Sequence, residues 1–430
     1  MASSSCTQYP AAAQGLWRIY TASGLTAIGN NLLFVGIFFF TKYQFGWTPR
    51  QNFLLAGGQG LFYIVGALSA HPLTRKMDRR TGLIVLSAPM SLATVAAAMF
   101  PNAVVVTAVV LFYTVVNSTG WPIFESLVSD GADPRRLSRR IGAYNLSWAP
   151  VGVAVIAIEG TLINIWPPLV FALPAAAHVV ALALLWNDRR RRPLRVAAAP
   201  VVPPQAEAAL LDKRELALWL SRIALPTTFC LIYSLGAIMP SLRLIGELPK
   251  AGQTAVASVW MAGRVLAFML LITTTWWHTR PRLLLGASVI MVIAFLGICV
   301  RWSDLAAGIG LGRHSLAADI VWICSWELVL GMVMGLIYSA SLYFGMVLSE
   351  GSTEHGGYHE ALIGLGQVIG PAVGVSTMYF WPGNLPKSVA AISALLAASV
   401  VLSVFAGFKR NHLRAKSGDD GPVGGGKIAG

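Results

Sequence analysis

Charged residues are scarce in this chain of 430 residues, at 12% of the total against roughly 25% in an average soluble protein. The four cysteines form no C-x-x-C pair and have no histidine at ligand spacing, which argues against a disulfide framework or a zinc site. The sequence also lacks a G-x4-G-K-[ST] phosphate loop, a G-x-S-x-G nucleophile and an H-E-x-x-H metal pair. We therefore expect neither an enzyme nor an ATP-driven pump, and no metal or cofactor.

Hydrophobic residues are abundant instead, at 56% of the chain. A helix needs about 20 mostly apolar residues to cross a bilayer, and twelve segments satisfy or nearly satisfy this length. The pattern predicts an all-α integral membrane protein embedded in a lipid bilayer. The segments are Leu16 to Phe40, Gln51 to Leu73, Gly82 to Phe100, Ala103 to Val128, Ile141 to Ile165, Pro168 to Trp186, Leu216 to Leu242, Thr254 to Trp277, Leu283 to Val300, Asp319 to Leu348, Glu360 to Phe380 and Val389 to Phe408.

One long polar stretch separates these segments six and six. It opens with Asn187, Asp188 and four consecutive arginines, and then runs through a tract rich in Pro and Ala. Adjacent arginines do not sit in hydrocarbon, and the tract has too little apolar surface to fold alone, so we expect a solvated linker. The predicted parts are a six-helix half at 1–186, a basic linker at 187–215, a second six-helix half at 216–408 and a disordered tail at 409–430.

Capping-box spacings mark two of the expected helix starts. Thr48 precedes Pro49 and is followed three residues later by Gln51, and Asp212 is followed three residues later by Glu215. The first pair predicts the start of the second membrane segment, and the second pair predicts the start of the seventh.

The formal net charge is +14, with 32 Lys and Arg against 18 Asp and Glu. Most of the basic residues lie in the linker, the tail and the loops on one side of the predicted membrane. By the positive-inside rule that side faces the cytoplasm, so the charge does not indicate nucleic acid. We expect a monomer in the cell (inner) membrane with both termini in the cytoplasm. The first fifteen residues lack the charged start of a secretory signal, so no cleavage is expected.

The two halves repeat each other. The basic loop that begins at Asp78 after the second segment matches the loop that begins at His278 after the eighth. In the same way, Ser129-Asp130-Gly131 corresponds to Ser349-Glu350-Gly351. Parallel repeats of this kind are found in transporters whose binding site lies between the halves.

With its twelve segments, basic central linker and basic loop at Met77-Asp78-Arg79-Arg80, the sequence resembles the major facilitator superfamily. The loop motif is degenerate, because Thr74 stands where that family has glycine. The resemblance implies a secondary active transporter that works by alternating access. It also implies a gating loop containing Asp78, Arg79 and Arg80, and a solute site built from spans one, two, four, five, seven, eight, ten and eleven.

A glycine pattern of many antiporters also occurs, displaced from the fifth span to the eleventh, where it reads Gly366, Gly370, Pro371 and Gly374. This displacement argues against an antiporter. Small residues four apart let another helix approach closely, so we interpret these glycines as a packing surface.

Arg264 and Glu327 are ionisable groups deep within predicted spans, where an unpaired charge costs several kcal/mol. Counting residues from the starts of their spans at about 1.5 Å each places the two at similar depths, so that they could pair. In the functional interpretation Glu327 exchanges a proton or ion, while Arg264 binds an anionic group or influences Glu327 until the solute displaces it. The alternatives are a static structural ion pair and an arginine packed against the cavity wall.

Uncharged polar and aromatic residues recur at helical spacing on other spans and suit a hydroxylated or zwitterionic solute. Each could equally be a hydrogen bond between helices, so the prediction depends on the set. Its members are Asn30, Asn31, Gln59, Tyr63, Tyr113, Asn117, Trp121, Tyr338 and Gln367.

Four further ionisable residues are predicted to lie outside the site. Glu125 and Glu159 fall near the ends of their spans, where solvation by interfacial water or pairing with loop arginines is favoured over a role in coupling. His355 and His359 fall in a loop before the eleventh span, where a metal site with the neighbouring glutamates is a remote alternative.

We therefore predict a secondary active transporter that imports a small polar organic solute, with protons as the coupling partner. The alternatives are efflux of amphipathic compounds, which a cavity lined mainly by Phe, Met and Leu would favour, and a sensor or scaffold on the same fold that does not transport.

Overall fold

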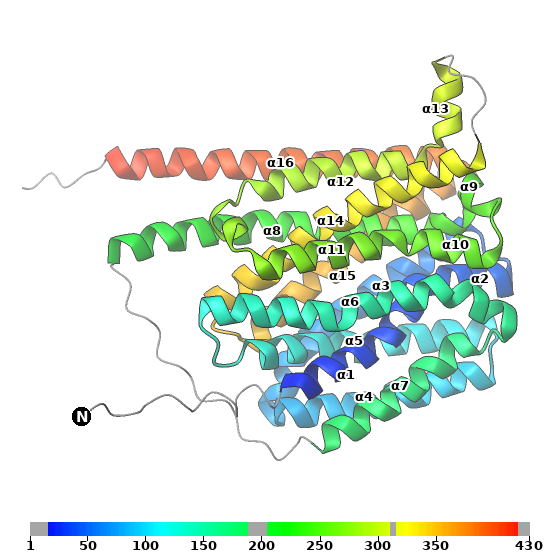
Figure 1. The fold of residues 1–430 in the computed structure, drawn as a ribbon, viewed down its shortest axis with the longest axis horizontal. Coiled ribbons are helices and arrows are strands. Elements are labelled where there is room, and N and C mark those ends of the chain that lie inside the picture. The colour runs from blue at the N-terminus through cyan, green and yellow to red at the C-terminus, as the bar shows by residue number, and fades with distance from the viewer. Residues whose placement is uncertain (1–15, 188–203, 310–314, 420–430) are drawn as a thin grey trace, which may run out of the picture.

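The chain folds into a bundle of long helices that run along one common direction (Figure 1). The computed structural model describes residues 16–187, 204–309 and 315–419, and this part contains helices and no strands. The first half consists of α1 (Leu16–Asn31), η2 (Leu32–Gly36), α2 (Ile37–Phe45), α3 (Pro49–Lys76), α4 (Arg79–Met99), α5 (Ala103–Ser129), α6 (Pro134–Ile165) and α7 (Leu169–Trp186).

The second half has the same plan with more interruptions. Its elements are α8 (Pro204–Ile238), η3 (Met239–Ser241), α9 (Arg243–Gly246), α10 (Lys250–Ala257), α11 (Val259–Thr273), η4 (Trp276–Thr279), α12 (Leu283–Cys299), α13 (Trp302–Gly308), α14 (Leu316–Leu348), α15 (Thr353–Phe380) and α16 (Leu385–Asp419).

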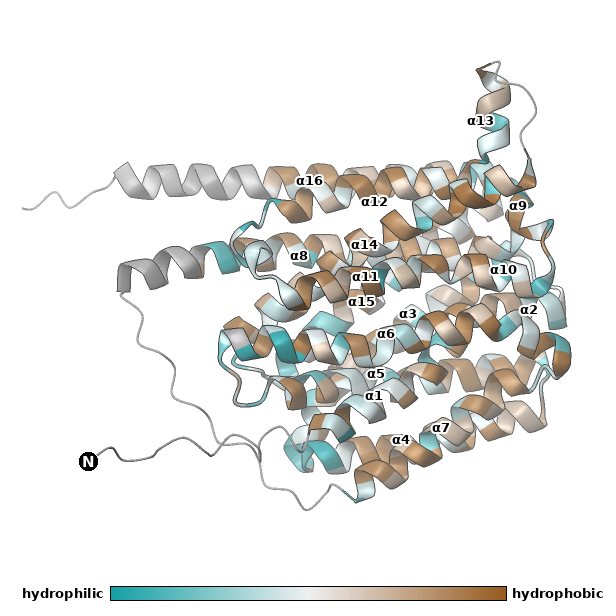
Figure 2. Ribbon diagram, viewed as in Figure 1, coloured by the Kyte–Doolittle hydropathy of each residue, from teal (hydrophilic) through white to brown (hydrophobic). Residues whose placement is uncertain are grey.

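Eleven helical segments of the described residues are long and apolar enough to cross a membrane. The remaining predicted span corresponds to α12, which is followed by α13 at an angle of 87°. Hydrophobic residues cover the middle of the bundle, whereas hydrophilic residues gather toward its ends (Figure 2). Exposed side chains such as Leu92, Val104 and Phe405 lie on this outer surface. The predicted all-α membrane fold is thus confirmed.

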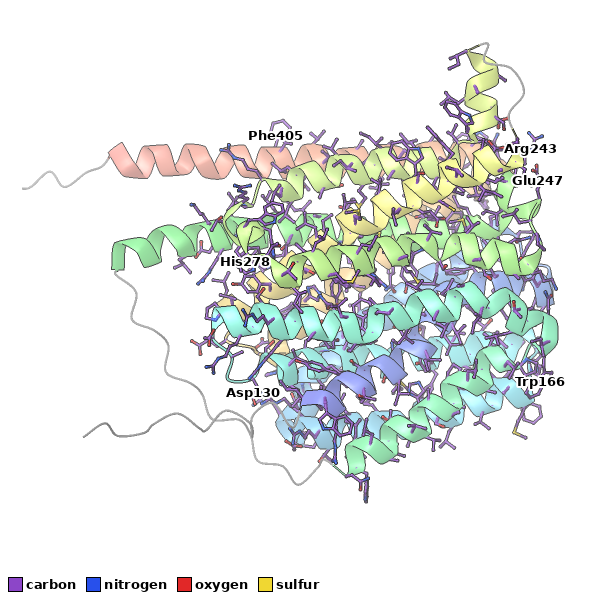
Figure 3. The ribbon with its side chains drawn as sticks, viewed as in Figure 1. Asp130, Trp166, Arg243, Glu247, His278 and Phe405 are labelled. Atoms are coloured by element: carbon purple, nitrogen blue, oxygen red, sulfur yellow. The ribbon has the colours of Figure 1, made fainter. Side chains whose placement is uncertain are left out.

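The two ends of the bundle are distinct and serve below as reference points (Figure 3). One end, called the His278 end, carries Asp130 and His278. The opposite end, called the Trp166 end, carries Trp166, Arg243 and Glu247. Helix α1 starts nearer the His278 end and runs toward the Trp166 end, whereas α11 starts nearer the Trp166 end and runs in the opposite direction (Figure 1).

Two spans are broken, and both breaks matter for the site. The first span passes from α1 through the π-helical turns of η2 into α2. The eighth span is divided at Ser258 between α10 and α11. Breaks of this kind leave backbone groups without their usual helical partners, so neighbouring side chains can bind them.

The capping signals give one correct helix start and one wrong one. Thr48 and Gln51 form the predicted capping box at the start of α3, where the Thr48 N–H donates to Gln51 Oε1 at 2.9 Å. Asp212 and Glu215, in contrast, lie inside α8, which already begins at Pro204. The run of Ala, Leu, Glu and Lys after Pro204 favours helix strongly enough to extend the span.

For the same reason the predicted linker and tail are too long. The second part of the linker, from Pro204, is the first turns of α8, and the tail is helical as far as Asp419. The four arginines at 189–192 and residues 420–430 lie outside the described residues.

Close packing through glycine joins α15 to its neighbours. Gly366 lies against the backbone of Pro226 and Cys230 in α8, and a Cβ at Gly370 would be 2.5 Å from Ser234 Oγ. The interpretation of the glycine series as a packing surface is confirmed. The same helix contacts α3 in the other half, where a Cβ at Gly60 would lie 2.6 Å from the Val368 backbone nitrogen.

Candidate functional site

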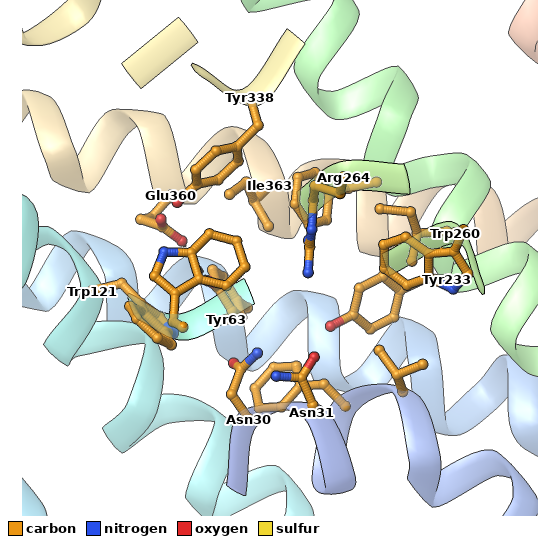
Figure 4. Close-up of a pocket in the computed structure, with 15 residues that line it drawn as sticks. Asn30, Asn31, Tyr63, Trp121, Tyr233, Trp260, Arg264, Tyr338, Glu360 and Ile363 are labelled. Carbon is orange, nitrogen blue, oxygen red and sulfur yellow. Dashed lines mark hydrogen bonds between the residues drawn. The ribbon is translucent and has the colours of Figure 1, made fainter. Parts of the chain in front are cut away.

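A central cavity lies between the two halves and encloses about 70 Å³ (Figure 4). Its walls come from spans one, two, four, five, seven, eight, ten and eleven, as the resemblance predicts, while α4, α7, α12 and α16 contribute none of the lining. The lining residues are Asn30, Asn31, Phe34, Val35, Tyr63, Trp121, Trp148, Phe229, Ile232, Tyr233, Trp260, Arg264, Tyr338, Glu360 and Ile363.

Contacts between the halves lie on both sides of this cavity. Toward the His278 end, Ser138 Oγ lies 3.3 Å from His278 Nε2, and the Asn145 amide approaches Ser339 Oγ at 3.4 Å. Toward the Trp166 end, the Gly160 N–H donates to Thr254 Oγ1 at 3.0 Å. Tyr43 on the same side donates to Gln253 Oε1, and the Asn52 amide donates to the Ala237 carbonyl at 3.5 Å.

Arg264 supplies the basic side chain of the lining. Its guanidinium lies over the rings of Trp148 and Trp260, 4.6 Å and 5.0 Å from their centroids. Only 7% of the residue is exposed, and its Nε has no hydrogen-bond partner. Among the residues that the structure describes, no carboxylate lies within the 4.0 Å ion-pair distance of Arg264. Two aromatic faces therefore hold a buried cation that has no counter-ion.

Polar groups of both halves face the same space as Arg264. The amides of Asn30 and Asn31, on α1, and the Tyr233 hydroxyl, on α8, converge on the cavity near the guanidinium (Figure 4). Asn30 Oδ1 accepts a hydrogen bond from the Asn117 amide at 2.8 Å, which fixes the orientation of Asn30. The Asn31 amide nitrogen donates to the Ala27 carbonyl at 2.7 Å, so the donors that this part of the cavity offers to a solute are the Asn30 amide, the Tyr233 hydroxyl and the Arg264 guanidinium.

Glu327 lies outside the cavity, and it does not pair with Arg264. The expected depths are similar and the helices are adjacent, since Gly331 of α14 packs against the Trp260 carbonyl of α11. The Glu327 carboxyl, however, lies beside the backbone N–H groups of Val259 and Trp260, without a well-formed hydrogen bond. These two residues begin α11 after the break at Ser258, and free N–H groups at a helix start attract a carboxylate. The predicted coupling role of Glu327 stays a prediction that this geometry does not favour.

A cluster of ionisable residues adjoins the cavity on the side of the His278 end. Glu125 of α5 and Glu360 of α15 are 1% and 2% exposed, and each accepts a hydrogen bond from a tyrosine. Tyr63 donates to Glu360 Oε2, and Tyr338 donates to Glu125 Oε1 at 3.5 Å. His359 Nε2 lies 4.0 Å from Glu125 Oε1. We call Glu125, His359 and Glu360 the carboxylate cluster.

The predictions for this cluster are wrong in position. Glu125 was expected at a solvated interface and His359 in a solvated loop, yet both are buried. The cause is the start of α15, which lies at Thr353 rather than at Glu360. The extra turns bring Gly356 against Pro122 and Glu125 of α5, so that the two helices cover each other's acidic residues. Glu159 is also buried, against Gly36 of the π-helical η2, rather than interfacial.

The carboxylate cluster could also offer ligands to a metal ion. One donor atom from each of its three residues lies within 4.8 Å of the other two. Two carboxylates and an imidazole are suitable donors for a divalent transition metal. The two tyrosine hydroxyls bind one oxygen of each carboxylate. The other oxygens remain available, so the cluster can hold a proton without a metal ion.

Not all predicted site residues reach the cavity. Asn30, Asn31, Tyr63, Trp121, Tyr338 and Arg264 line it. The other predicted residues form a second layer behind the lining. In this layer the Gln59 amide donates to the Leu33 carbonyl at 2.8 Å, Tyr113 Oη lies 2.8 Å from His178 Nε2, Asn117 binds Asn30, and Gln367 packs against Gly60 of α3.

The predicted gating loop makes contacts within the first half. The Asp78 carboxylate caps α4 by accepting hydrogen bonds from the N–H groups of Arg80 and Thr81. Arg79 forms an ion pair of 3.1 Å with Asp130 at the end of α5. The loop therefore ties the second, third and fourth spans together at the His278 end.

Sequence reasoning missed the aromatic residues that surround Arg264, together with Glu360. Trp148, Tyr233 and Trp260 stand in apolar spans where an aromatic residue gives no special signal. The position of Glu360 did have a usable signal, because the Ser352 side chain accepts a hydrogen bond from the Glu354 N–H and so caps the start of α15.

Two helical halves around a central polar cavity define a membrane transporter. The family model of the Major Facilitator Superfamily matches residues 19–371, most of the chain. The protein belongs to this superfamily, whose members are transporters rather than enzymes. No curated protein matches the chain.

Proposed function

We propose that this protein is a secondary active transporter that carries a small polar organic solute through the central cavity, coupled to protons at Glu125 and Glu360. Alternating access requires a site that each half can expose in turn. The observation that carries the proposal is a polar cavity with contacts between the halves on both of its sides.

Weak contacts at both ends support the alternation. The hydrogen bonds named above join neutral groups, and one such bond contributes about 0.5–1.5 kcal/mol net. The Lys250 ammonium over the Tyr43 ring at 4.8 Å is a partly exposed cation–π contact of similar size at the Trp166 end. Loss of these polar contacts when one end opens therefore costs only a few kcal/mol, in addition to the apolar contacts that separate. The His278 end would face the cytoplasm by the distribution of basic residues.

Proton coupling is supported by the pairing of carboxylates from different halves. Glu125 belongs to α5 in the first half and Glu360 to α15 in the second. Two carboxylates close together and out of water repel each other when both are ionised, so that they retain a proton between them. Separation of the halves at this end would hydrate both groups and let them exchange protons with water.

Solute uptake into proteoliposomes tests the proposal, with and without an imposed pH gradient. A thermal-shift screen of the purified protein first identifies solutes that bind the folded state. Glu125→Gln and Glu360→Gln should each abolish the dependence of uptake on the pH gradient. Glu327→Gln is the matched control, because it neutralises a buried carboxyl outside the cavity, and it should keep that dependence.

Three outcomes would contradict the proposal. If uptake in Glu125→Gln and Glu360→Gln still depends on the pH gradient, these two residues do not couple transport to protons. If only Glu327→Gln loses this dependence, the coupling residue is Glu327. Dependence on an added divalent metal rather than on pH would make the carboxylate cluster a metal site. Binding without any flux would identify a sensor rather than a transporter.

A second candidate function, efflux of amphipathic compounds, receives some support from a group of aromatic rings beside Arg264 and Tyr338. Trp148 lies at the centre of this group, and its ring centroid is 6.3 Å from that of Trp121 and 5.7 Å from that of Phe268. A buried unpaired arginine and two asparagine amides in the same cavity favour a solute with a strongly polar group instead.

A further inference from the structure

Arg264 sets a requirement that a neutral solute does not meet. Its guanidinium is charged at every physiological pH, and burial of such a cation without a counter-ion is unfavourable. The faces of Trp148 and Trp260 offset part of that penalty. Its Nε nevertheless has no partner, and the guanidinium points into the cavity (Figure 4). The missing partner is therefore an anionic group on the solute.

The surroundings of Arg264 suit a carboxylate. A guanidinium presents two parallel N–H donors to a planar carboxylate, and the Asn30 amide and the Tyr233 hydroxyl offer further donors nearby. Most of the remaining lining is apolar or aromatic, including Phe34, Trp121 and Ile363, and the Glu360 carboxyl lies in the wall on the side of the His278 end. The cavity volume of about 70 Å³ corresponds to roughly five water-sized groups. These features fit a small acid with one anionic group and an apolar body.

We infer that the solute is a small organic monocarboxylate, bound by Arg264, and that it moves together with one proton in an electroneutral cycle. The inference rests on the proposed function, because it assigns the substrate class and stoichiometry of the same cavity. It adds a prediction about charge that the proposed function does not contain.

The stoichiometry follows from the charges that face the cavity. In the empty cavity no carboxylate of the described residues contacts Arg264 directly, but one negative charge on Glu125 and Glu360, which then share a single proton, brings the net charge of the three groups to zero. A bound carboxylate takes over the role of counter-ion to Arg264, so the glutamate pair becomes neutral only by taking up a second proton. Both the empty and the loaded cavity are then neutral when the halves move. Neutrality matters because a net charge in a low-dielectric interior is strongly disfavoured.

Binding is tested by thermal shift with butyrate and benzoate, against butyramide and benzamide as neutral matches. The acids should raise the melting temperature of the wild type, and the amides should have little effect. Arg264→Met and Arg264→Lys should each weaken acid binding at least tenfold, Lys because it lacks the paired N–H donors. Glu327→Gln should leave the affinity unchanged and serves as the control for a buried ionisable site.

Stoichiometry is tested in proteoliposomes whose pH gradient and membrane potential are set independently. Uptake of butyrate should increase with an inward proton gradient and stay constant when the potential is changed. A double variant, Glu125→Gln with Glu360→Gln, leaves the empty cavity with the charge of Arg264 alone. It should keep exchange of internal for external butyrate and lose net uptake, because only the loaded carrier is then neutral.

The two levels of the hypothesis can fail separately. One result would overturn the monocarboxylate inference and leave the proposed function standing. In that result only neutral or cationic solutes bind, and their transport is driven by a proton gradient and requires Glu360. Uptake of an acid that changes with membrane potential overturns the electroneutral cycle. If no solute moves under any gradient, both proposals fail. Unchanged acid binding in Arg264→Met removes the role of the guanidinium.

Discussion

Replacement of Arg264 by methionine should make the protein more stable and unable to bind its solute. The substitution removes two cation–π contacts, with Trp148 at 4.6 Å and Trp260 at 5.0 Å, worth about 0.5–2 kcal/mol each. It also removes a cation that is buried without a counter-ion, which carries a penalty of several kcal/mol. Hydration of the cavity reduces this penalty, so we expect a net gain of about 1–3 kcal/mol in the free energy of unfolding.

The melting temperature of the purified protein in detergent is the direct measurement. A gain of this size corresponds to a rise of about 1–3 °C in a chain of this length. Arg264→Lys keeps the charge and should show no such rise, which separates the effect of charge from that of packing. Solute binding should be lost in the methionine variant at the same time, so that instability cannot account for the loss.

A fall in the melting temperature of Arg264→Met by more than ~2 °C would refute this reasoning. It would show that stacking on the two tryptophans outweighs the penalty for the charge. A stabilised variant that still binds its solute would instead leave the stability argument intact and remove Arg264 from the site.

Three further predictions concern the coupling site, the His278 end and the packing between the halves. Glu327→Gln should keep uptake driven by a pH gradient, whereas Glu360→Gln should lose it, as uptake into proteoliposomes would show. Burial lowers the pKa of His278 to about 4, with nearby Arg214 lowering it further. The closed His278 end should therefore lose stability as the pH falls from about 6.5 toward 4. Labelling of a cysteine placed at the buried Ile141 should increase over this range in the wild type and stay constant in His278→Phe. Gly60→Val should slow transport at least tenfold and increase labelling of cysteines placed in the cavity. The added Cβ would lie 2.6 Å from the Val368 nitrogen and hold the two halves apart. Equal transport rates in the variant and the wild type would contradict this close contact.

The sequence was sufficient for the fold because long apolar segments have few other uses. A run of about 20 apolar residues satisfies its backbone in lipid only as a helix. The ends of the helices were less certain, since hydropathy falls where polar residues enter a span. The first turns of α15 contain Glu354, His355, His359 and Glu360. Because these residues are polar, the sequence predicts a loop there, and the burial of Glu360 next to Glu125 is not predicted.

The site residues were predictable where their burial is unfavourable. Arg264 is conspicuous because a charge in an apolar span needs a reason, and the structure places it in the cavity. Glu327 is conspicuous for the same reason, but it lies outside the cavity. The break of the eighth span at Ser258 leaves the backbone N–H groups of Val259 and Trp260 without helical partners, and the Glu327 carboxyl lies beside them. A local break in a helix leaves no trace in hydropathy, so the sequence could not distinguish the two cases.

The division of the binding groups between the halves suggests how a solute would control the cycle. Asn30 belongs to the first half, and Tyr233 and Arg264 to the second. A carboxylate that contacts Arg264 and Asn30 at once gains its full set of hydrogen bonds only when the halves are closed around it. Its affinity is then higher for the closed state than for either open state, and a ligand shifts a conformational equilibrium only through such a difference. A difference of a few kcal/mol, about the worth of the hydrogen bonds that join the halves at one end, shifts this equilibrium strongly toward the closed state.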